Sequence, residues 1–343
     1  MSAAVPPPRG AVDGRLAEIA QAGGLGLSLV DLDAAVRPPS ASGPSGDGIV
    51  RVGVRRGPGP LPIEGLETFD ILLCADPAAP APWVGVSPDQ LDAAIAQLAE
   101  VVEGQPVAAA VAAQVHRMTL KLSFAESLVL ESLGYSMLLA SESFKAWRAS
   151  TPVRVRQNDD GPRVAMERTG QVLSIRLTRP NVRNAVDSRM RDALAEALEF
   201  ALVDPDQALV VLSGEGAAFS AGGDLDQFGE ADDPGRAHAI RVLRYATGLV
   251  HRLGGRVHAR LHGACVGAGI EIPAAAARVT ARPGALFRLP EVSMGLIPGA
   301  GGTASIPRRL GRHRACWMAV SGAALDVATA LAWGLVDAVD EDP

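Results

Sequence analysis

Two glutamates, Glu271 and Glu291, lie among small residues in the stretch 261–303. A pair of carboxylates in different surroundings can divide acid–base work, because one then holds a proton that the other releases. The small residues 267–269 allow backbone N–H groups to approach a ligand closely. These residue types predict acid–base chemistry beside a carbonyl group, although a glutamate that follows proline, such as Glu291, is more often a surface carboxylate.

A second run of small residues, 221–223, follows the predicted strand 207–215, and the run 267–269 follows the predicted strand 257–264. In parallel α/β folds, ligands collect at the loops after the carboxyl ends of strands. Either run alone is more often a tight turn. Together they are the parts of an oxyanion hole, which stabilises negative charge on a carbonyl oxygen, and a helix beginning near Gly269 would add its dipole.

Other motifs for catalysis or metal binding are weaker. His258 and His262 are four residues apart, which suits zinc on a helix, but they lie in a strand pattern with no third ligand near them in the sequence. We therefore expect no metal. The chain lacks a G-x-S-x-G pattern for a serine hydrolase. Its glycine-rich runs SAGGD and GAGGT lack the lysine of a P-loop and the acidic partner of a dinucleotide site.

The composition indicates a globular protein. Its 343 residues are 48% hydrophobic, and the formal net charge of −6 gives no basic field that would hold nucleic acid. Three cysteines, Cys74, Cys265 and Cys316, lie far apart, so reduced thiols are expected rather than disulfides or a zinc site. No apolar stretch reaches the length of a membrane span. We expect a soluble, cytoplasmic chain without nucleic-acid or membrane partners.

Residues 1–87 are rich in proline and glycine, which is typical of loops and linkers. Short apolar runs interrupt them and predict the strands of a small sheet. These runs are residues 24–36, 49–54 and 69–76. The function of this region stays open.

Residues 88–150 have the pattern of a helical module. Ser87 predicts the N-cap of an amphipathic helix, because apolar residues recur at helical spacing after it. A second helix is predicted from Pro106, where proline suits the first turn, and one or two more within 124–150.

A domain boundary is predicted at 151–164, where two prolines and an Asn-Asp-Asp-Gly run signal turns. From 163 to 343, predicted strands and helices alternate, which is typical of βαβ units with a largely parallel sheet. The elements are strands 172–179, 207–215 and 257–264, and helices 188–204 and 235–253. The sequence therefore predicts an α/β fold for this catalytic core.

Four motifs lie along the core. They are RPNVRNAV (179–186), FSAGGDL (219–225), HGACVGAGIE (262–271) and LPEVSMGLIPGAGGT (289–303). In this order and spacing they resemble the crotonase superfamily, the enoyl-CoA hydratases and isomerases, over roughly residues 163–340. The resemblance implies an α/β, crotonase-like spiral of ββα units, assembled as homotrimers or dimers of trimers.

The resemblance also implies roles for single residues. Gly223 and Ala268 would donate backbone N–H groups to the oxygen of a thioester, while Glu271 and Glu291 would face its Cα–Cβ bond. We expect Glu291 to donate a proton and Glu271 to position the water as a base. Contacts to CoA are implied for Asn181, Val182, Arg183, Ala185, Ala221, Asp224 and Leu225. An acyl pocket is implied for Phe228, Val292 and Leu296.

The activity that this resemblance implies is hydration of a 2-enoyl-CoA to a 3-hydroxyacyl-CoA, with no cofactor besides the CoA of the substrate. Alternatives within the family are a double-bond isomerase, or a lyase, hydrolase or cofactor-free oxygenase acting on an aryl or polyketide thioester. A non-catalytic acyl-CoA-binding protein is a further alternative, although both glutamates and both runs of small residues are retained.

Members of the family normally continue beyond a GLVDAV segment, here 334–339, with helices that cover the active site and build the trimer. This sequence ends soon after that segment, whereas the module 88–150 is similar to those helices in composition. We therefore expect a permuted arrangement in which the module packs on the core as its lid. The alternative is an added helical domain that serves only assembly.

Overall fold

The predicted strands near the N-terminus form a parallel sheet in the order β1-β2-β3-β4. The computed structural model describes residues 24–33, 47–154, 160–230 and 233–340; the loops predicted within 1–23 and 34–46, and part of the predicted boundary, lie outside them. The strands are β1 Leu25–Asp31, β2 Gly48–Arg55, β3 Ile71–Cys74 and β4 Val84–Gly85. The three predicted strands are confirmed, and β4 was missed because it has only two residues.

Four helices follow this sheet. They are α2 Leu91–Gly104, α3 Pro106–Thr119, α4 Phe124–Leu139 and α5 Glu142–Ser150. The prediction that Ser87 caps the first helix is wrong, because its carbonyl accepts from Gln90 N at 2.9 Å in a turn and Gln90 takes the N-cap position. Ser123 and Glu126 form a capping box at α4, which fixes where that helix begins.

A second sheet has six strands in the order β13-β10-β8-β7-β6-β5. The strands are β5 Val164–Thr169, β6 Val172–Leu177, β7 Leu209–Gly214, β8 Val257–Leu261, β10 Arg278–Ala281 and β13 Ala338–Val339. All neighbours are parallel except the β5–β6 hairpin. The largely parallel sheet predicted for the core is therefore confirmed.

The prediction of one continuous helix over 235–253 is wrong. The chain instead forms α7 Pro234–Leu243 and α8 Ala246–Leu253, separated at Tyr245, whose backbone is extended. Tyr245 is buried and its hydroxyl donates to Glu131 in α4 at 3.1 Å. This tertiary contact, which the local sequence pattern does not contain, accompanies the break. The helix predicted over 188–204 is confirmed as α6 Ser188–Val203.

A third, small sheet pairs β9 Ala264–Val266 with β11 Leu286–Arg288, and β11 with β12 Leu325–Asp326. Two of the ββα units contribute one strand to the large sheet and the next to the small one: β8, β9 and α9 Ala268–Glu271 form one unit, and β10, β11 and α10 Gly302–Leu310 another. The α/β class and the ββα arrangement predicted for the core are confirmed.

Among the described residues, the remaining elements are helices α11 Arg312–Ser321 and α12 Val327–Trp333 and six short 3-10 turns. The turns are η1 Leu66–Thr68, η2 Pro180–Val182, η3 Leu225–Gln227, η4 Gly254–Arg256, η5 Pro273–Ala275 and η6 Glu291–Met294. Within the described ranges, every helix is too short or too polar to cross a lipid bilayer.

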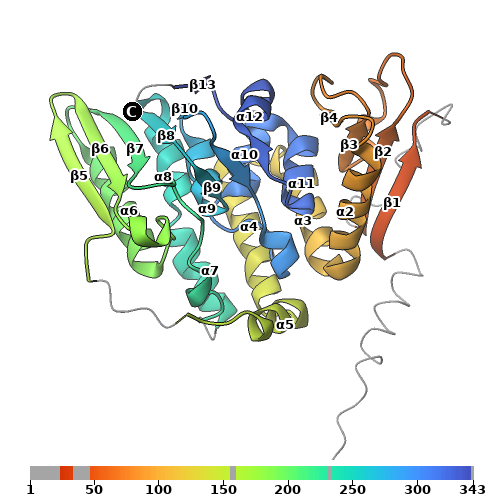
Figure 1. Cartoon of the computed structure of the whole chain (residues 1–343). Helices are drawn as coiled ribbons and strands as arrows, with labels where there is room; N and C mark the ends of the chain where they lie inside the picture. The colour runs from red at the N-terminus through yellow and green to blue at the C-terminus, as the bar shows by residue number, and fades with distance from the viewer. Residues whose placement is uncertain (1–23, 34–46, 155–159, 231–232, 341–343) are drawn as a thin grey trace, which may run out of the picture.

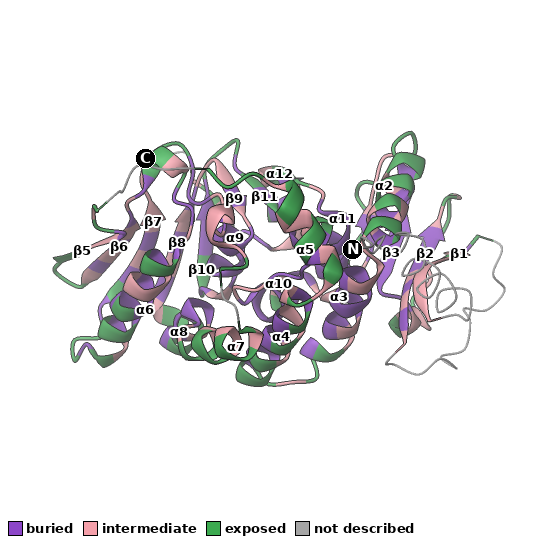
Figure 2. Ribbon diagram, turned by 90° about the horizontal axis from the view of Figure 1, so that it is seen from below, coloured by how far each residue is buried: buried purple, intermediate pink, exposed green. Residues whose placement is uncertain are grey.

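Helices α3 and α4 lie between the two larger sheets (Figure 1). Helix α3 packs on β2 of the N-terminal sheet and on α11, while α4 packs on α7 and α10 of the core. Helix α3 is buried on nearly all sides, whereas α4 is buried toward the core and exposed on its outer face (Figure 2). One hydrophobic cluster runs from Val50 in β2 through α3 to Val336 beside β13, so the helices join the N-terminal sheet to the core.

Candidate active site

A cavity of about 330 Å³ lies between the core and helix α4. Four predicted site residues line it together: Gly223, Ala268, Glu271 and Glu291. Parallel pairing explains how the two glutamates meet. Strands β9 and β11 run side by side in parallel, with Val266 opposite Arg288. The segments carrying Glu271 and Glu291 therefore begin next to each other, at the carboxyl ends of these two strands.

The two runs of small residues meet as predicted. Val266 N donates to Ser220 O at 3.0 Å, and a Cβ on Gly222 would lie 2.7 Å from Val266 O. Gly222 also has a φ of 90°, so glycine is required there for two reasons. Among the hydrogen bonds of the described residues, none uses the backbone N–H of Gly223 or Ala268. Two N–H donors are therefore available at the cavity.

Asn184, which the sequence reasoning did not single out, holds this loop in place. Its buried side-chain amide donates to three carbonyl oxygens, of Glu215, Ala218 and Phe219, at 2.8 to 3.0 Å. Asn184 lies inside the RPNVRNAV motif. Its position, next to residues predicted to touch CoA, was the signal that could have found it.

Glu271 is buried, with only 2% of its surface exposed. Its Oε2 accepts from Ala300 N at 2.7 Å and from Gly302 N at 2.8 Å. Burial, followed by the neighbouring carboxylates Glu291 and Glu131, raises the pKa of Glu271 well above its usual value. The two N–H bonds act in the opposite direction, because they stabilise the ionised form.

Glu291 is also buried, and its Oε2 has no hydrogen-bond partner within the described residues. Burial raises its pKa to about 8. Its Oε1 lies against Gly267, where an added Cβ would come within 2.4 Å of that oxygen. Burial therefore favours the protonated form of both carboxyl groups, and of the two only Glu271 accepts backbone N–H bonds from residues 300–302, which stabilise its anion.

A third carboxyl group, Glu131, was missed by the sequence reasoning. It comes from α4, is fully buried, and burial raises its pKa to about 7. Its Oε1 accepts from Gly301 N at 2.7 Å, and its Oε2 accepts from both the N–H and the hydroxyl of Thr303 at 2.8 Å. A lone acidic residue in a helical pattern carries no sign of such distant partners.

The residues predicted to bind CoA lie in two adjacent loops. Ala221 N donates to Arg183 O at 2.8 Å, which joins these loops. Asp224 is buried, pairs with Arg179 at 3.2 Å and lines the cavity. Asn181 and Arg183 are exposed, Val182 and Leu225 are half-buried, and Ala185 is buried; these residues do not line the cavity.

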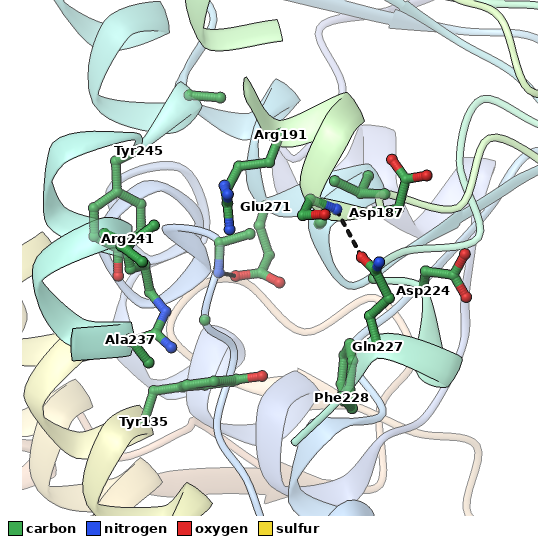
Figure 3. A pocket seen from close by; sticks show the side chains of 18 of the residues that line it. Tyr135, Asp187, Arg191, Asp224, Gln227, Phe228, Ala237, Arg241, Tyr245 and Glu271 are labelled. Carbon is green, nitrogen blue, oxygen red and sulfur yellow. Dashed lines mark hydrogen bonds between the residues drawn. The ribbon is translucent and has the colours of Figure 1, made fainter. Parts of the chain in front are cut away.

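The three residues predicted to form the acyl pocket do not all line the cavity. Phe228 lines the cavity, whereas Val292 and Leu296 are almost fully buried in the core and do not line it. Their side chains pack inward, which residue type alone does not reveal. The cavity is lined instead by Tyr135 and Leu139 of α4, Ile240 and Arg241 of α7, and Tyr245 (Figure 3).

Comparison with known protein families gives a match over the core. The family model for enoyl-CoA hydratase/isomerase matches residues 167–342. The chain belongs to this family. The resemblance predicted from the four motifs is thereby confirmed. The matched segment begins after α5, so helices α2 to α5 of this protein lie outside the family model.

Two curated relatives and one solved structure illustrate the similarity. The chain is 32% identical to 2,3-dehydroadipyl-CoA hydratase of Escherichia coli, over 51% of this chain and 68% of that relative. It is 34% identical to mevalonyl-coenzyme A hydratase of Beauveria bassiana, over 48% and 62% of the two chains. A crystal structure of enoyl-CoA hydratase from Thermoplasma volcanium shares 33% identity, with coverage of 53% and 73% and a TM-score of 0.49. The chain thus spans about two thirds of the length of these relatives.

Proposed function

We propose that this protein hydrates the double bond of a 2-enoyl-CoA to give a 3-hydroxyacyl-CoA. The observation that carries the proposal is that two buried glutamates and two unused backbone N–H groups line one cavity. The homologous hydratases support it, because hydration is the reaction that their names describe.

The N–H groups of Gly223 and Ala268 would bind the thioester oxygen and stabilise the enolate that forms when water attacks Cβ. Glu271 would hold the water and accept one of its protons, so that the hydroxyl group joins Cβ. Glu291 would deliver its proton to Cα. One water is consumed, and the proton taken up by Glu271 balances the proton lost by Glu291.

The surroundings of the two acids support this division. Burial raises the pKa of both carboxyl groups, but only Glu271 has two backbone N–H donors, at its Oε2, that stabilise the anion a base needs. The unpartnered Oε2 of Glu291 is free to hold a substrate atom or water. We propose no cofactor besides the CoA of the substrate.

The loops that contain Asn181, Arg183 and Ala221 would hold the CoA outside the cavity. They are joined to each other and adjoin Asp224, which lines the cavity. Helix α4 would serve as the lid, because Tyr135 and Leu139 close one side of the cavity. This supports the permuted arrangement over a module that serves only assembly.

We propose a homotrimer or a dimer of trimers as the assembly. Helix α4 carries three exposed apolar residues at four-residue spacing, Val129, Leu133 and Met137, which form a stripe on the side away from the core. Sedimentation equilibrium would test this state. The cytoplasm remains our proposed compartment, on the basis of the free and buried cysteines Cys74, Cys265 and Cys316.

The decisive experiment follows loss of the enoyl absorbance of crotonyl-CoA with the wild type, Glu271→Gln and Glu291→Gln. A hydratase should lose several orders of magnitude in kcat with either replacement, whereas an isomerase that uses one acid should be insensitive to one of them. No absorbance change across several enoyl chain lengths would count against hydration. It would favour a specialised thioester enzyme or a binding protein.

A further inference from the structure

One cation lines the cavity without an ionic partner. Arg241 of α7 lines the same cavity as Glu271, and Figure 3 draws both side chains there. Its Nη1 donates to the hydroxyls of Ser132 and Ser136 in α4, both at 2.9 Å. Across the described parts of the chain, no carboxylate forms an ion pair with Arg241, and its Nε and Nη2 donate no hydrogen bond. Two donor groups of this guanidinium are therefore free for a ligand.

The position of this guanidinium is fixed. Its central carbon lies 4.3 Å from the centre of the Tyr135 ring, and the two serine hydroxyls hold Nη1 from one side. A fixed guanidinium recognises planar anions such as carboxylates well, because its donors are already oriented.

The other carboxyl groups nearby do not require Arg241 as a counter-ion. Glu131 accepts hydrogen bonds from Gly301, Thr303 and Tyr245, and Glu271 accepts two from backbone N–H groups. The second arginine of the cavity, Arg191, is paired with Asp192 at 2.9 Å. Arg241 thus differs from its neighbours in having no anion, and a partly buried cation is stabilised when a ligand supplies one.

We infer that the acyl chain accepted by this cavity ends in a carboxylate, which Arg241 binds. The inference rests on the proposed function only for the position of the thioester end, between Gly223 and Ala268. The acyl group would then extend from Glu271 and Glu291 past the Tyr135 ring. A neutral acyl chain of the same length would leave the cation unpaired.

Binding of two saturated thioesters tests this inference without requiring catalysis. Adipyl-CoA and hexanoyl-CoA have six-carbon acyl groups and differ only in a terminal carboxylate or methyl group. Titration calorimetry on the full chain should give a Kd for adipyl-CoA about 10- to 100-fold lower, as expected for a charge-assisted hydrogen bond. Arg241→Gln should remove this preference, Arg241→Lys should retain part of it, and the matched variant Arg191→Gln should keep it.

Equal Kd values for the two thioesters in the wild type would overturn the inference. So would a loss in Arg241→Gln that is the same for both thioesters, because Arg241 would then meet the CoA phosphates or serve only packing against α4. If Arg241→Gln does not fold, the wild-type ratio and Arg241→Lys decide the question. Hydration is measured separately with 2-hexenoyl-CoA and with 2,3-dehydroadipyl-CoA, which has a terminal carboxylate; activity with neither would contradict the proposed function, whereas the Kd ratio alone decides the role of Arg241.

Discussion

Glu131 and Glu271 accept hydrogen bonds from alternate backbone N–H groups of one stretch, residues 300–303. Ala300 and Gly302 donate to Glu271, while Gly301 and Thr303 donate to Glu131. The stretch leads into α10, so both carboxylates also lie at the positive end of a helix dipole. The helical module therefore fixes the same backbone segment that orients the predicted base.

Glu131→Gln should weaken this arrangement. Its amide nitrogen would face a donor, either Thr303 N or Gly301 N, so one buried group loses its partner at a cost of about 1–3 kcal/mol in the free energy of unfolding. We expect kcat to fall more than KM rises, because Glu271 loses its fixed position. Denaturant titration and steady-state kinetics with crotonyl-CoA measure both effects.

The control for this variant is Glu126→Gln on the same helix. Glu126 lies at the exposed start of α4 and accepts from Ser123 N, which a glutamine oxygen can also do. Its effect on stability and kcat should be small. If the two variants behave alike, Glu131 does not act through residues 300–303.

Activity should fall as the pH rises through about 8. Glu291 must hold a proton to deliver it, and burial raises its pKa to about 8. The charge on Glu131 contributes to raising this pKa, so Glu131→Gln should move the alkaline limb of kcat/KM to lower pH. A limb that moves to higher pH, or stays in place, would contradict the proposed coupling. Profiles from pH 5 to 10 measure the shift.

The free energy of unfolding should also depend on the ionisation of Glu291, and the direction of this pH dependence can be stated in advance. The pKa of Glu291 rises from 4.5 to about 8 on folding, so the folded state keeps a proton that the unfolded state releases. The contribution of this group is complete below pH 4.5 and is lost as the pH rises to about 8. Glu291→Gln should therefore flatten the fall in unfolding free energy between these values. An unchanged slope would mean that Glu291 does not retain its proton in the folded state.

The sequence predicted the parts of the site that lie within local motifs. Gly223, Ala268, Glu271 and Glu291 were recognisable because each stands in a run of small residues or a family motif, and they line one cavity. Strands and most helices of the core followed from periodicity. These features depend on neighbouring residues, which a sequence displays directly.

The rest of the site depends on contacts between distant residues. Glu131 lies 170 residues before Gly301, and Arg241 lies 105 residues after Ser136. Val292 and Leu296 were assigned to the acyl pocket from their motif, but their side chains turn into the core. Which way a side chain points, and what lies opposite it, is set by packing between segments.

Gly267→Ala should strongly lower activity, because the added Cβ changes the geometry of the site. Gly267 has a φ of 50°, and an added Cβ would lie 2.4 Å from Oε1 of Glu291. The carboxyl group or the backbone would have to shift, which moves the proton donor and the adjacent N–H of Ala268. We expect kcat to fall at least 100-fold while the chain still folds. Gly284→Ala, at another positive φ of 78° but with open space around it, is the matched control. Equal losses in both variants would point to backbone strain and not to the contact with Glu291.

The ion pair between Arg117 and Asp70 should hold the N-terminal sheet onto the helices. Nε and Nη2 of Arg117 in α3 donate to the two carboxylate oxygens of Asp70, each at 2.7 Å, and Asp70 is only 1% exposed. Arg117→Met keeps much of the side-chain length but leaves a buried carboxylate without its cation. Removing one partner of a buried pair costs about 3–5 kcal/mol, so the midpoint of denaturant unfolding should fall clearly.

Arg56→Met is the matched control for this variant, because the pair of Arg56 with Asp92 is exposed and should contribute at most about 1 kcal/mol. A similar small loss in both variants would show that the Arg117 pair does not stabilise the fold. Thr119, two residues after Arg117, donates to Thr303 O at 2.7 Å. Loosening the last turn of α3 in Arg117→Met should therefore also disturb residues 300–303. We expect kcat to decline in this variant at denaturant concentrations where the wild type and Arg56→Met are still fully active.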